Sequence, residues 1–221
     1  MSWVALALLG GVVGLDATSF PQIMISRPIV AATLAGLVLG HPGLGFSFGV
    51  VLEAFHLAIL PIGAARYPEA GTAAAAGAFA LVTAGTGVGP APLLITLGFA
   101  LVWGRVAAAS VEASRHASER VVRAAEPEVG PAGVEIRHMA AMAIDFGRGA
   151  FITVTGAAIG WLLLRAVAAG NPPHPVIAQG ALVVLLCGAA AGALTVFGGI
   201  SERKASFVAG AAVGTLIAVF A

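Results

Sequence analysis

The chain has 221 residues, of which 59% are hydrophobic and only 10% are charged, and its formal net charge is +1 at pH 7. An ordinary soluble domain carries about 25% charged residues, and the mean hydropathy here is +1.01. This composition excludes a soluble globular protein and predicts an all-α, polytopic integral membrane protein. A nucleic-acid-binding protein is excluded as well, because no basic block is present to neutralise phosphates.

The first apolar segment begins at the N-terminus with Met1-Ser-Trp-Val-Ala-Leu-Ala. It lacks the basic residues that precede the apolar core of a cleavable signal peptide. We therefore expect it to be retained as a membrane segment.

The following apolar runs are short. Residues 28–40 give 13 positions before His41-Pro42-Gly43, and residues 44–60 give 17 before Pro61. A full span needs about 20 residues, so these lengths predict broken or re-entrant helices in the N-terminal half. Transporters place substrates where helices are interrupted, because backbone N–H and C=O groups are then free at mid-membrane.

Polar side chains interrupt the same region and are candidate site residues. A charge at membrane depth costs at least about 2.5–3.5 kcal/mol, so it persists mainly where it lines a cavity or has a partner. The candidates are Asp16, Gln22, Arg27, Glu53, His56, Arg66, Tyr67 and Glu69. They predict a polar pathway or a binding site.

Glu53 and His56 stand three residues apart and share one helical stripe with Gly45 and Gly49. Glu-x-x-His is also the unit of di-iron bundle sites, but only one copy occurs, so we predict no metal site. Two interpretations remain open. The pair either forms a hydrogen bond that satisfies two buried groups, or it contacts a substrate or a proton.

Arg27 and Arg66 have structural interpretations. Arg27 precedes Pro28 at an expected helix start, where it anchors at the membrane interface or pairs with Asp16. Arg66 and Glu69 could form an ion pair within a turn, and such a pair would hold geometry without contacting a substrate.

Residues 105–148 hold six of the eleven Lys and Arg and six of the ten Asp and Glu. Three parts are therefore predicted: a membrane block with broken helices and the substrate site (1–104), a cytoplasmic amphipathic hinge (105–148) and a C-terminal transmembrane block (149–221). Lys/Arg-rich short loops stay in the cytoplasm. The hinge is either a solvated link between two helix bundles or a docking surface for a soluble partner.

In the last block, residues 149–169 and 176–199 are expected to cross the membrane and return, and the final run, 205–221, has 17 residues, short for a span. Cys187 is the only cysteine, so it forms no intrachain disulfide and is expected to be a small buried hydrophobe. No His-Glu-x-x-His, Gly-x-Ser-x-Gly or P-loop motif occurs. We predict no catalytic residue, metal or cofactor on this chain.

Several motifs resemble a known family in their order and spacing. They are Gly14-Leu-Asp16, Ser26-Arg-Pro-Ile-Val-Ala31, Thr33-Leu-Ala-Gly-Leu-Val-Leu-Gly40, Val51-Leu-Glu53 and Pro61-Ile-Gly-Ala-Ala65. Over residues 10–75 the chain resembles the N-terminal half of the IIC membrane subunit of mannose/sorbose-type bacterial phosphotransferase systems (PTS). The resemblance implies a channel subunit of the bacterial inner membrane that forms a hetero-oligomer with a second membrane subunit, IID.

The resemblance also implies that a mannose-type sugar moves inward and is phosphorylated by soluble IIA and IIB phosphocarriers, with the phosphohistidine on another chain. By motif match it nominates Glu53 and the segment 63–69 for the sugar site. Carboxylates and amides bind sugar hydroxyls, so Glu53, Glu69 and Gln22 are expected to supply hydrogen bonds. Phe55 or Tyr67 would supply an apolar face for the ring, or would only pack.

Two other functions remain open. In an ion- or proton-coupled secondary transporter, Glu53 and His56 would titrate during transport. In a non-transporting regulatory homologue, neutralising Glu53 would leave uptake unchanged.

Overall fold

The computed structural model describes residues 2–57, 59, 67–86, 89–123, 130–170, 172–196, 198–202 and 204–220. Within these residues every regular element is an α-helix, which confirms the predicted fold class. In chain order the helices are α1 (Ser2–Thr18), α2 (Pro28–Val38), α3 (Pro42–His56), α4 (Ala70–Thr83), α5 (Pro90–Arg123), α6 (Pro131–Ala169), α7 (Pro175–Val196), α8 (Gly199–Glu202) and α9 (Lys204–Phe220).

The helices of the first half are short, as the interrupted apolar runs predict. Helices α2, α3 and α4 have 11, 15 and 14 residues, all below the length of a full span. Pro28 and Pro42 start α2 and α3, where a missing N–H costs no hydrogen bond. Gly40 ends α2 with a φ of 75°, and the His41 N–H donates to the Gly36 carbonyl at 2.8 Å, as in a Schellman motif.

Helix α4 lies at the centre of the bundle. All its residues from Gly71 to Leu81 are buried, and it contacts α1, α2, α3, α5 and α6. Six of these eleven residues are alanine, so neighbouring helices approach closely. Phe48, Leu52 and Leu97 fill the largest core cluster around it.

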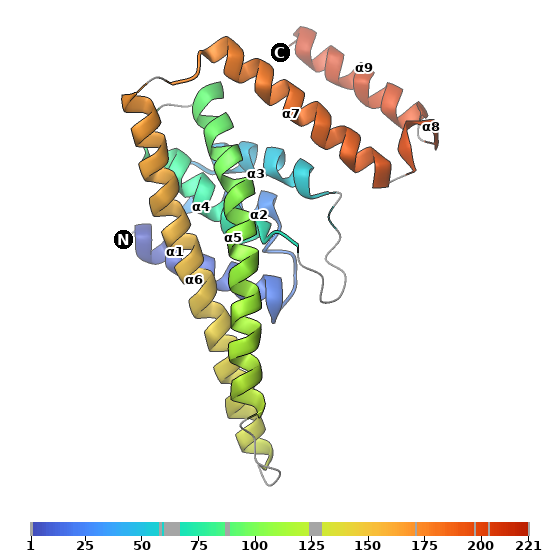
Figure 1. The fold of residues 1–221 in the computed structure, drawn as a ribbon. Coiled ribbons are helices and arrows are strands. Elements are labelled where there is room, and N and C mark those ends of the chain that lie inside the picture. Colours follow the sequence, from blue (N-terminus) through green and yellow to red (C-terminus); the bar gives the residue numbers. More distant parts are fainter. Residues whose placement is uncertain are drawn as a thin grey trace.

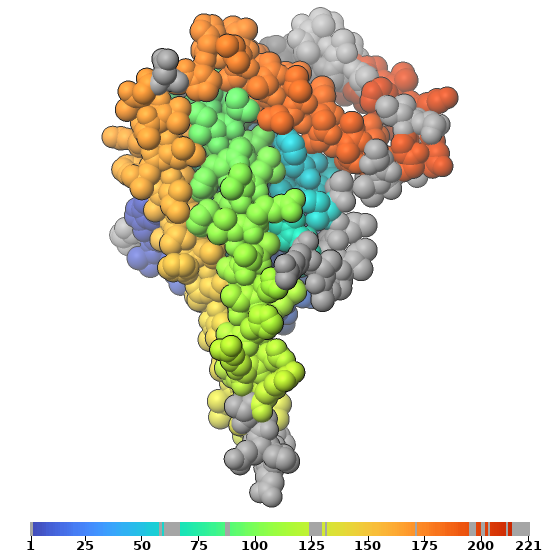
Figure 2. All heavy atoms as spheres, viewed as in Figure 1, coloured from blue at the N-terminus to red at the C-terminus, as the bar shows by residue number. Residues whose placement is uncertain are grey.

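Helices α5 and α6 form a long antiparallel pair (Figure 1). With 34 and 39 residues and about 1.5 Å per residue, they measure roughly 50 and 60 Å, against about 30 Å for the bilayer core. Their charged ends form a narrow stalk (Figure 2). Within the described residues, Pro90–Arg123, Ala132–Ala169 and Pro175–Leu194 are long and apolar enough to cross a membrane.

The predicted hinge, 105–148, does not form an element of its own. It comprises the second half of α5 and the first half of α6, so both of its boundaries fall inside continuous helices. Glu119 and Arg123, one turn apart on α5, form an ion pair at 2.5 Å. The three-part division and the cytoplasmic side of the stalk stay predictions.

Helix α7 packs on α3 and α5, and α9 contacts α8. The prediction that Cys187 is buried is wrong, because the thiol is exposed on α7. In a membrane helix an apolar run does not imply burial in protein, since lipid accepts apolar side chains as readily as a protein core does.

Candidate functional site

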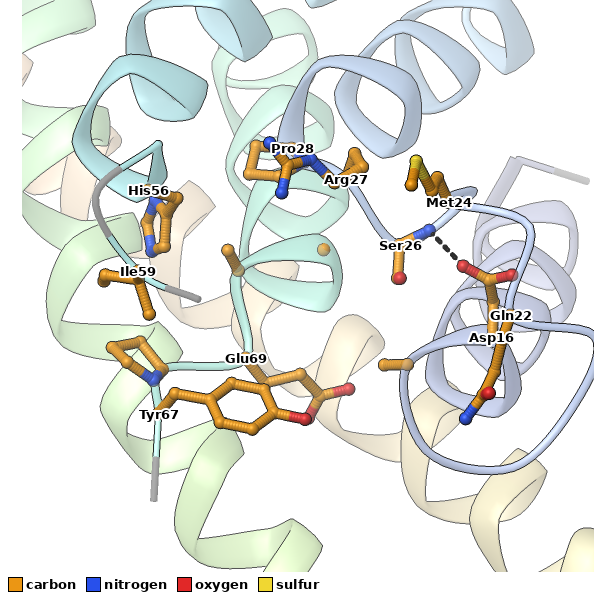
Figure 3. Close-up of a pocket in the computed structure, with 14 residues that line it drawn as sticks. Asp16, Gln22, Met24, Ser26, Arg27, Pro28, His56, Ile59, Tyr67 and Glu69 are labelled. Atoms are coloured by element: carbon orange, nitrogen blue, oxygen red, sulfur yellow. Dashed lines mark hydrogen bonds between the residues drawn. The ribbon is translucent and has the colours of Figure 1, made fainter. Parts of the chain in front are cut away.

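A cavity of about 340 Å³ lies between the end of α1, the loop 19–27, the end of α3 and the segment 67–71. Figure 3 shows Ser26 and Gln22 across this space from His56 and Tyr67. The polar residues that line it are Asp16, Gln22, Ser26, Arg27, His56, Tyr67 and Glu69. Four of the five residues predicted to bind substrate therefore surround one cavity; Glu53 is not among its lining residues.

Asp16 holds the loop between α1 and α2. Its carboxylate is 3% exposed and accepts hydrogen bonds from the N–H groups of Ile23 and Ser26, both at 2.7 Å. Within this loop Gln22 and Met24 have φ values of 58° and 68°, in the left-handed region that residues other than glycine seldom adopt. The two bonds to Asp16 stabilise this conformation, which brings Gln22 and Ser26 to the cavity.

Of the two roles left open for Arg27, the pair with Asp16 is wrong, and the anchor at the membrane interface stays a prediction. Both Asp16 oxygens bind backbone amides, and Arg27 instead forms an ion pair with Glu53 on α3. Glu53 also accepts the Ile29 N–H at 3.3 Å, so it ties the start of α2 to α3. Glu53 contributes to the cavity through Arg27, which it orients; its direct contact with a substrate stays a prediction.

Of the two interpretations left open for Glu53 and His56, the hydrogen bond between them does not form, and contact with a substrate or a proton stays a prediction. His56 is 7% exposed, and its Nδ1 lies 2.8 Å from the Leu52 carbonyl oxygen of its own helix. Because a carbonyl only accepts, Nδ1 carries the proton, and Nε2 is the acceptor of the neutral ring. Among the described residues no group of three or more His, Cys, Asp and Glu side chains is placed to hold a metal ion.

Sequence reasoning missed the partner of Glu69. Arg148 on α6 binds both carboxylate oxygens, with Nη1 at 2.5 Å from Oε2 and Nη2 at 3.2 Å from Oε1. The side chains of Arg148 and Glu69 are only 7% and 4% exposed. Arg66, the expected partner of Glu69, lies outside the described residues.

Asp145, one turn before Arg148, forms a second polar contact that the sequence did not reveal. Its carboxylate accepts hydrogen bonds from the hydroxyls of Thr18, at 3.0 Å, and Ser19. The available signal was Asp145-Phe-Gly-Arg-Gly149, where two charges and two glycines directly precede the apolar half of α6. Charges at the edge of an apolar run often have partners within the bundle.

A second cavity, of about 590 Å³, lies at the base of the stalk between α1, α5 and α6, and Thr18, Arg115, Ala141 and Asp145 are among the residues that line it. A third cavity, of about 220 Å³, is lined by Tyr67 and by residues of α5. Among these three cavities the first holds four of the residues predicted to bind substrate, the third holds only Tyr67, and the second holds none. The first cavity is therefore the candidate substrate site.

Replacing Asp16 with asparagine is expected to lower the free energy of unfolding by about 1.5–3 kcal/mol, the usual contribution of a hydrogen bond to a charged group. An asparagine keeps one acceptor oxygen and places an N–H₂ group against a backbone N–H. Thermal unfolding of the purified protein in detergent measures this loss. Ser47→Ala removes a bond from an exposed hydroxyl to the Gly43 carbonyl and is the control, expected within about 0.5 kcal/mol of wild type. Equal stability of the two variants would contradict the role of Asp16.

Comparisons with known proteins agree with this architecture. One solved structure, described as a membrane protein, has a TM-score of 0.72 and 18% identity over 99% of this chain and 94% of its own. A second, the mannose transporter ManYZ in complex with microcin E492, has a TM-score of 0.64 and 20% identity over 99% of this chain and 93% of its own. At 18% and 20% identity, the likeness shows that this chain shares the fold of these two proteins.

The search of curated proteins gave no match. The model of the PTS system sorbose-specific IIC component matches residues 1–173, most of the chain. The match extends past residues 10–75, where the motifs are found, through α5 and α6. The chain belongs to the family of sorbose-specific IIC components of the phosphotransferase system.

Proposed function

We propose that this protein is the IIC channel subunit of a phosphoenolpyruvate-dependent phosphotransferase system, which moves a mannose-type sugar inward for phosphorylation by a soluble IIB partner. The observation that carries the proposal is the polar cavity in the family-matched region. Its volume of about 340 Å³ lies at the lower end of the range of about 300–1,000 Å³ for small-molecule sites. A monosaccharide suits a cavity of that size.

The lining side chains match the needs of a sugar. Each hydroxyl donates and accepts, and Gln22 offers both an amide donor and an amide acceptor. Arg27 supplies a donor, whereas Glu69 and the Nε2 of His56 supply acceptors. Tyr67 offers an aromatic face for the ring. Each carboxylate among the described lining residues is bound by an arginine or by backbone amides, so these carboxylates present no unpaired charge to a neutral ligand.

We assign the phosphorylation of the sugar to other chains. We propose that this subunit binds and passes the sugar, while phosphoryl groups are carried by soluble IIA and IIB proteins. The stalk formed by 105–148 would then face the cytoplasm of a bacterium, where those phosphocarriers act.

A second membrane subunit, IID, is the proposed partner in a hetero-oligomer. Helices α7 and α9 present large exposed apolar side chains, including Val176, Ile177, Val184 and Val208. Such surfaces require lipid or another membrane protein. The solved ManYZ transporter, which shares this fold, supports a partner in the membrane.

Uptake in vesicles tests the proposal. Vesicles containing the chain, the candidate IID subunit and the soluble phosphocarriers are loaded with phosphoenolpyruvate and supplied with radiolabelled mannose or sorbose. Sugar phosphate is expected to accumulate inside, and to fail to accumulate without phosphoenolpyruvate or without IID. An ionophore that collapses the membrane potential should leave the accumulation unchanged.

Two results would contradict the proposal. Uptake of free sugar that follows the membrane potential and ignores phosphoenolpyruvate would indicate an ion-coupled transporter. No uptake, in vesicles where a known permease works, would indicate a non-transporting homologue.

A further inference from the structure

Arg148 joins four parts of the chain at the wall of the first cavity. From α6 it binds both oxygens of Glu69, at 2.5 and 3.2 Å. The same guanidinium donates to the Ser110 hydroxyl on α5 at 3.3 Å and to the Gly14 carbonyl on α1 at 3.4 Å. Both members of the ion pair are almost fully buried. Contacts with α1, α5 and the segment before α4 therefore fix the guanidinium of α6 in place.

A guanidinium held in this way fixes the plane of the carboxylate it binds. Its fork pairs with both oxygens, so rotation of the carboxylate breaks at least one hydrogen bond. Glu69 precedes α4 in a non-helical segment, where its own N–H donates to the Gly104 carbonyl at 3.0 Å. The backbone bond places the residue, and Arg148 orients its side chain.

Glu69 keeps acceptor capacity toward the cavity. Its side chain is part of the cavity wall, and Figure 3 shows it beside Tyr67. An ionised carboxylate offers about four lone-pair sites, of which the two hydrogen bonds from Arg148 use two. Sugar hydroxyls can therefore donate to a carboxylate that Arg148 already holds.

We infer that Arg148 is a positioning residue for sugar binding, which holds the Glu69 carboxylate in one orientation in the cavity wall. The inference rests on the proposed function, because it requires a sugar in this cavity. Arg148 is not itself a lining residue, so it acts through Glu69.

Stability alone does not account for the pair. Well-packed apolar residues often replace a buried ion pair without loss of stability. The Nε of Arg148 is also buried without a hydrogen-bond partner, which costs free energy. A side chain selected only to stabilise the bundle would not need to leave a donor unsatisfied.

The test separates affinity from the amount of folded protein. Initial rates of radiolabelled mannose uptake are measured over a range of concentrations in the vesicles described above, for wild type, Arg148→Lys and Glu69→Gln. Lysine keeps the positive charge but lacks the planar guanidinium that pairs with both carboxylate oxygens. Arg148→Lys is expected to raise the apparent KM about tenfold, as when one charge-assisted hydrogen bond is lost, with Vmax per folded complex within about twofold of wild type. Glu69→Gln is expected to raise KM at least as much.

Two further variants keep the test decisive. Thr155→Val, on the same helix, removes a hydroxyl that donates at 2.7 Å to the Phe151 carbonyl of α6 itself and is the matched control, with an unchanged KM. Ser110→Ala removes the hydroxyl to which Arg148 donates on α5. It is a smaller change than Arg148→Lys, so it is expected to fold even if the lysine variant does not. It is expected to raise KM about two- to threefold, since a neutral hydrogen bond contributes less than a charge-assisted one.

The outcomes distinguish this inference from the proposed function. A raised KM in Glu69→Gln with wild-type values in Arg148→Lys and Ser110→Ala would overturn the positioning role and leave the sugar site intact. A lower amount of folded complex with unchanged KM in the two Arg148-directed variants would make the role purely structural, which also overturns it. Wild-type KM in all variants would remove Glu69 from the sugar site. No saturable mannose uptake by the wild type would overturn the proposed function and the positioning role together.

Discussion

Replacing Arg148 with methionine is expected to lower the free energy of unfolding by about 3–5 kcal/mol, as observed when one partner of a buried ion pair is removed. The Glu69 side chain is only 4% exposed, and the substitution removes the charge that compensates its burial. Chemical or thermal unfolding of the purified protein in detergent measures the loss. It would be among the largest effects of any single substitution in this chain.

A double variant distinguishes the loss of the ion pair from the loss of packing by the arginine side chain. Arg148→Met combined with Glu69→Gln removes both charges, so it is expected to be more stable than Arg148→Met alone. If the double variant instead shows the sum of the two single losses, the side chains do not interact and the ion pair has no energetic role.

Gly149→Ala is expected to destabilise the protein by about 1–3 kcal/mol or more, because an added methyl group overpacks a closed helix contact. A Cβ at Gly149 would lie 2.8 Å from the Gly14 Cα and against the Gly10 carbonyl oxygen. These are backbone atoms of α1, so α1 and α6 must separate. Separation also moves the Gly14 carbonyl away from Arg148.

Gly147 provides the matched control on the same helix. A Cβ there meets nothing within 4 Å, and alanine favours a helix over glycine by about 0.8–1.0 kcal/mol. Gly147→Ala should therefore be as stable as wild type or more stable. Equal unfolding temperatures for the two alanine variants would contradict the close contact between α1 and α6.

The first half of the fold follows from local signals in the sequence. Pro28 and Pro42 begin α2 and α3, and Gly40 ends α2, because proline and glycine act within a few residues of their own position. Five residues were predicted to bind substrate: Glu53, Glu69, Gln22, His56 and Tyr67. The last four line one cavity and Glu53 does not, and contact of any of them with a substrate stays a prediction.

The pairing of charges could not be predicted in the same way. Arg148 lies 79 residues from Glu69, and a single sequence does not reveal which helix faces which. The charge density of 105–148 indicated a solvated hinge, whereas α6 carries Arg148 into the bundle. Asp16 was one of the partners considered for Arg27, yet the N–H groups of Ile23 and Ser26 bind Asp16, and Arg27 pairs with Glu53.

Site-directed labelling tests most directly the claim that a sugar occupies the first cavity. Cys187 is the only cysteine, so Cys187→Ser gives a background without thiols. In that background Ser26→Cys places a thiol in the first cavity, and Ala141→Cys places one in the second. Mannose is expected to slow the reaction of a small maleimide with the thiol at position 26 and to leave the rate at position 141 unchanged. An unchanged rate at position 26, at mannose concentrations that saturate uptake, would contradict the assignment of the sugar site to this cavity.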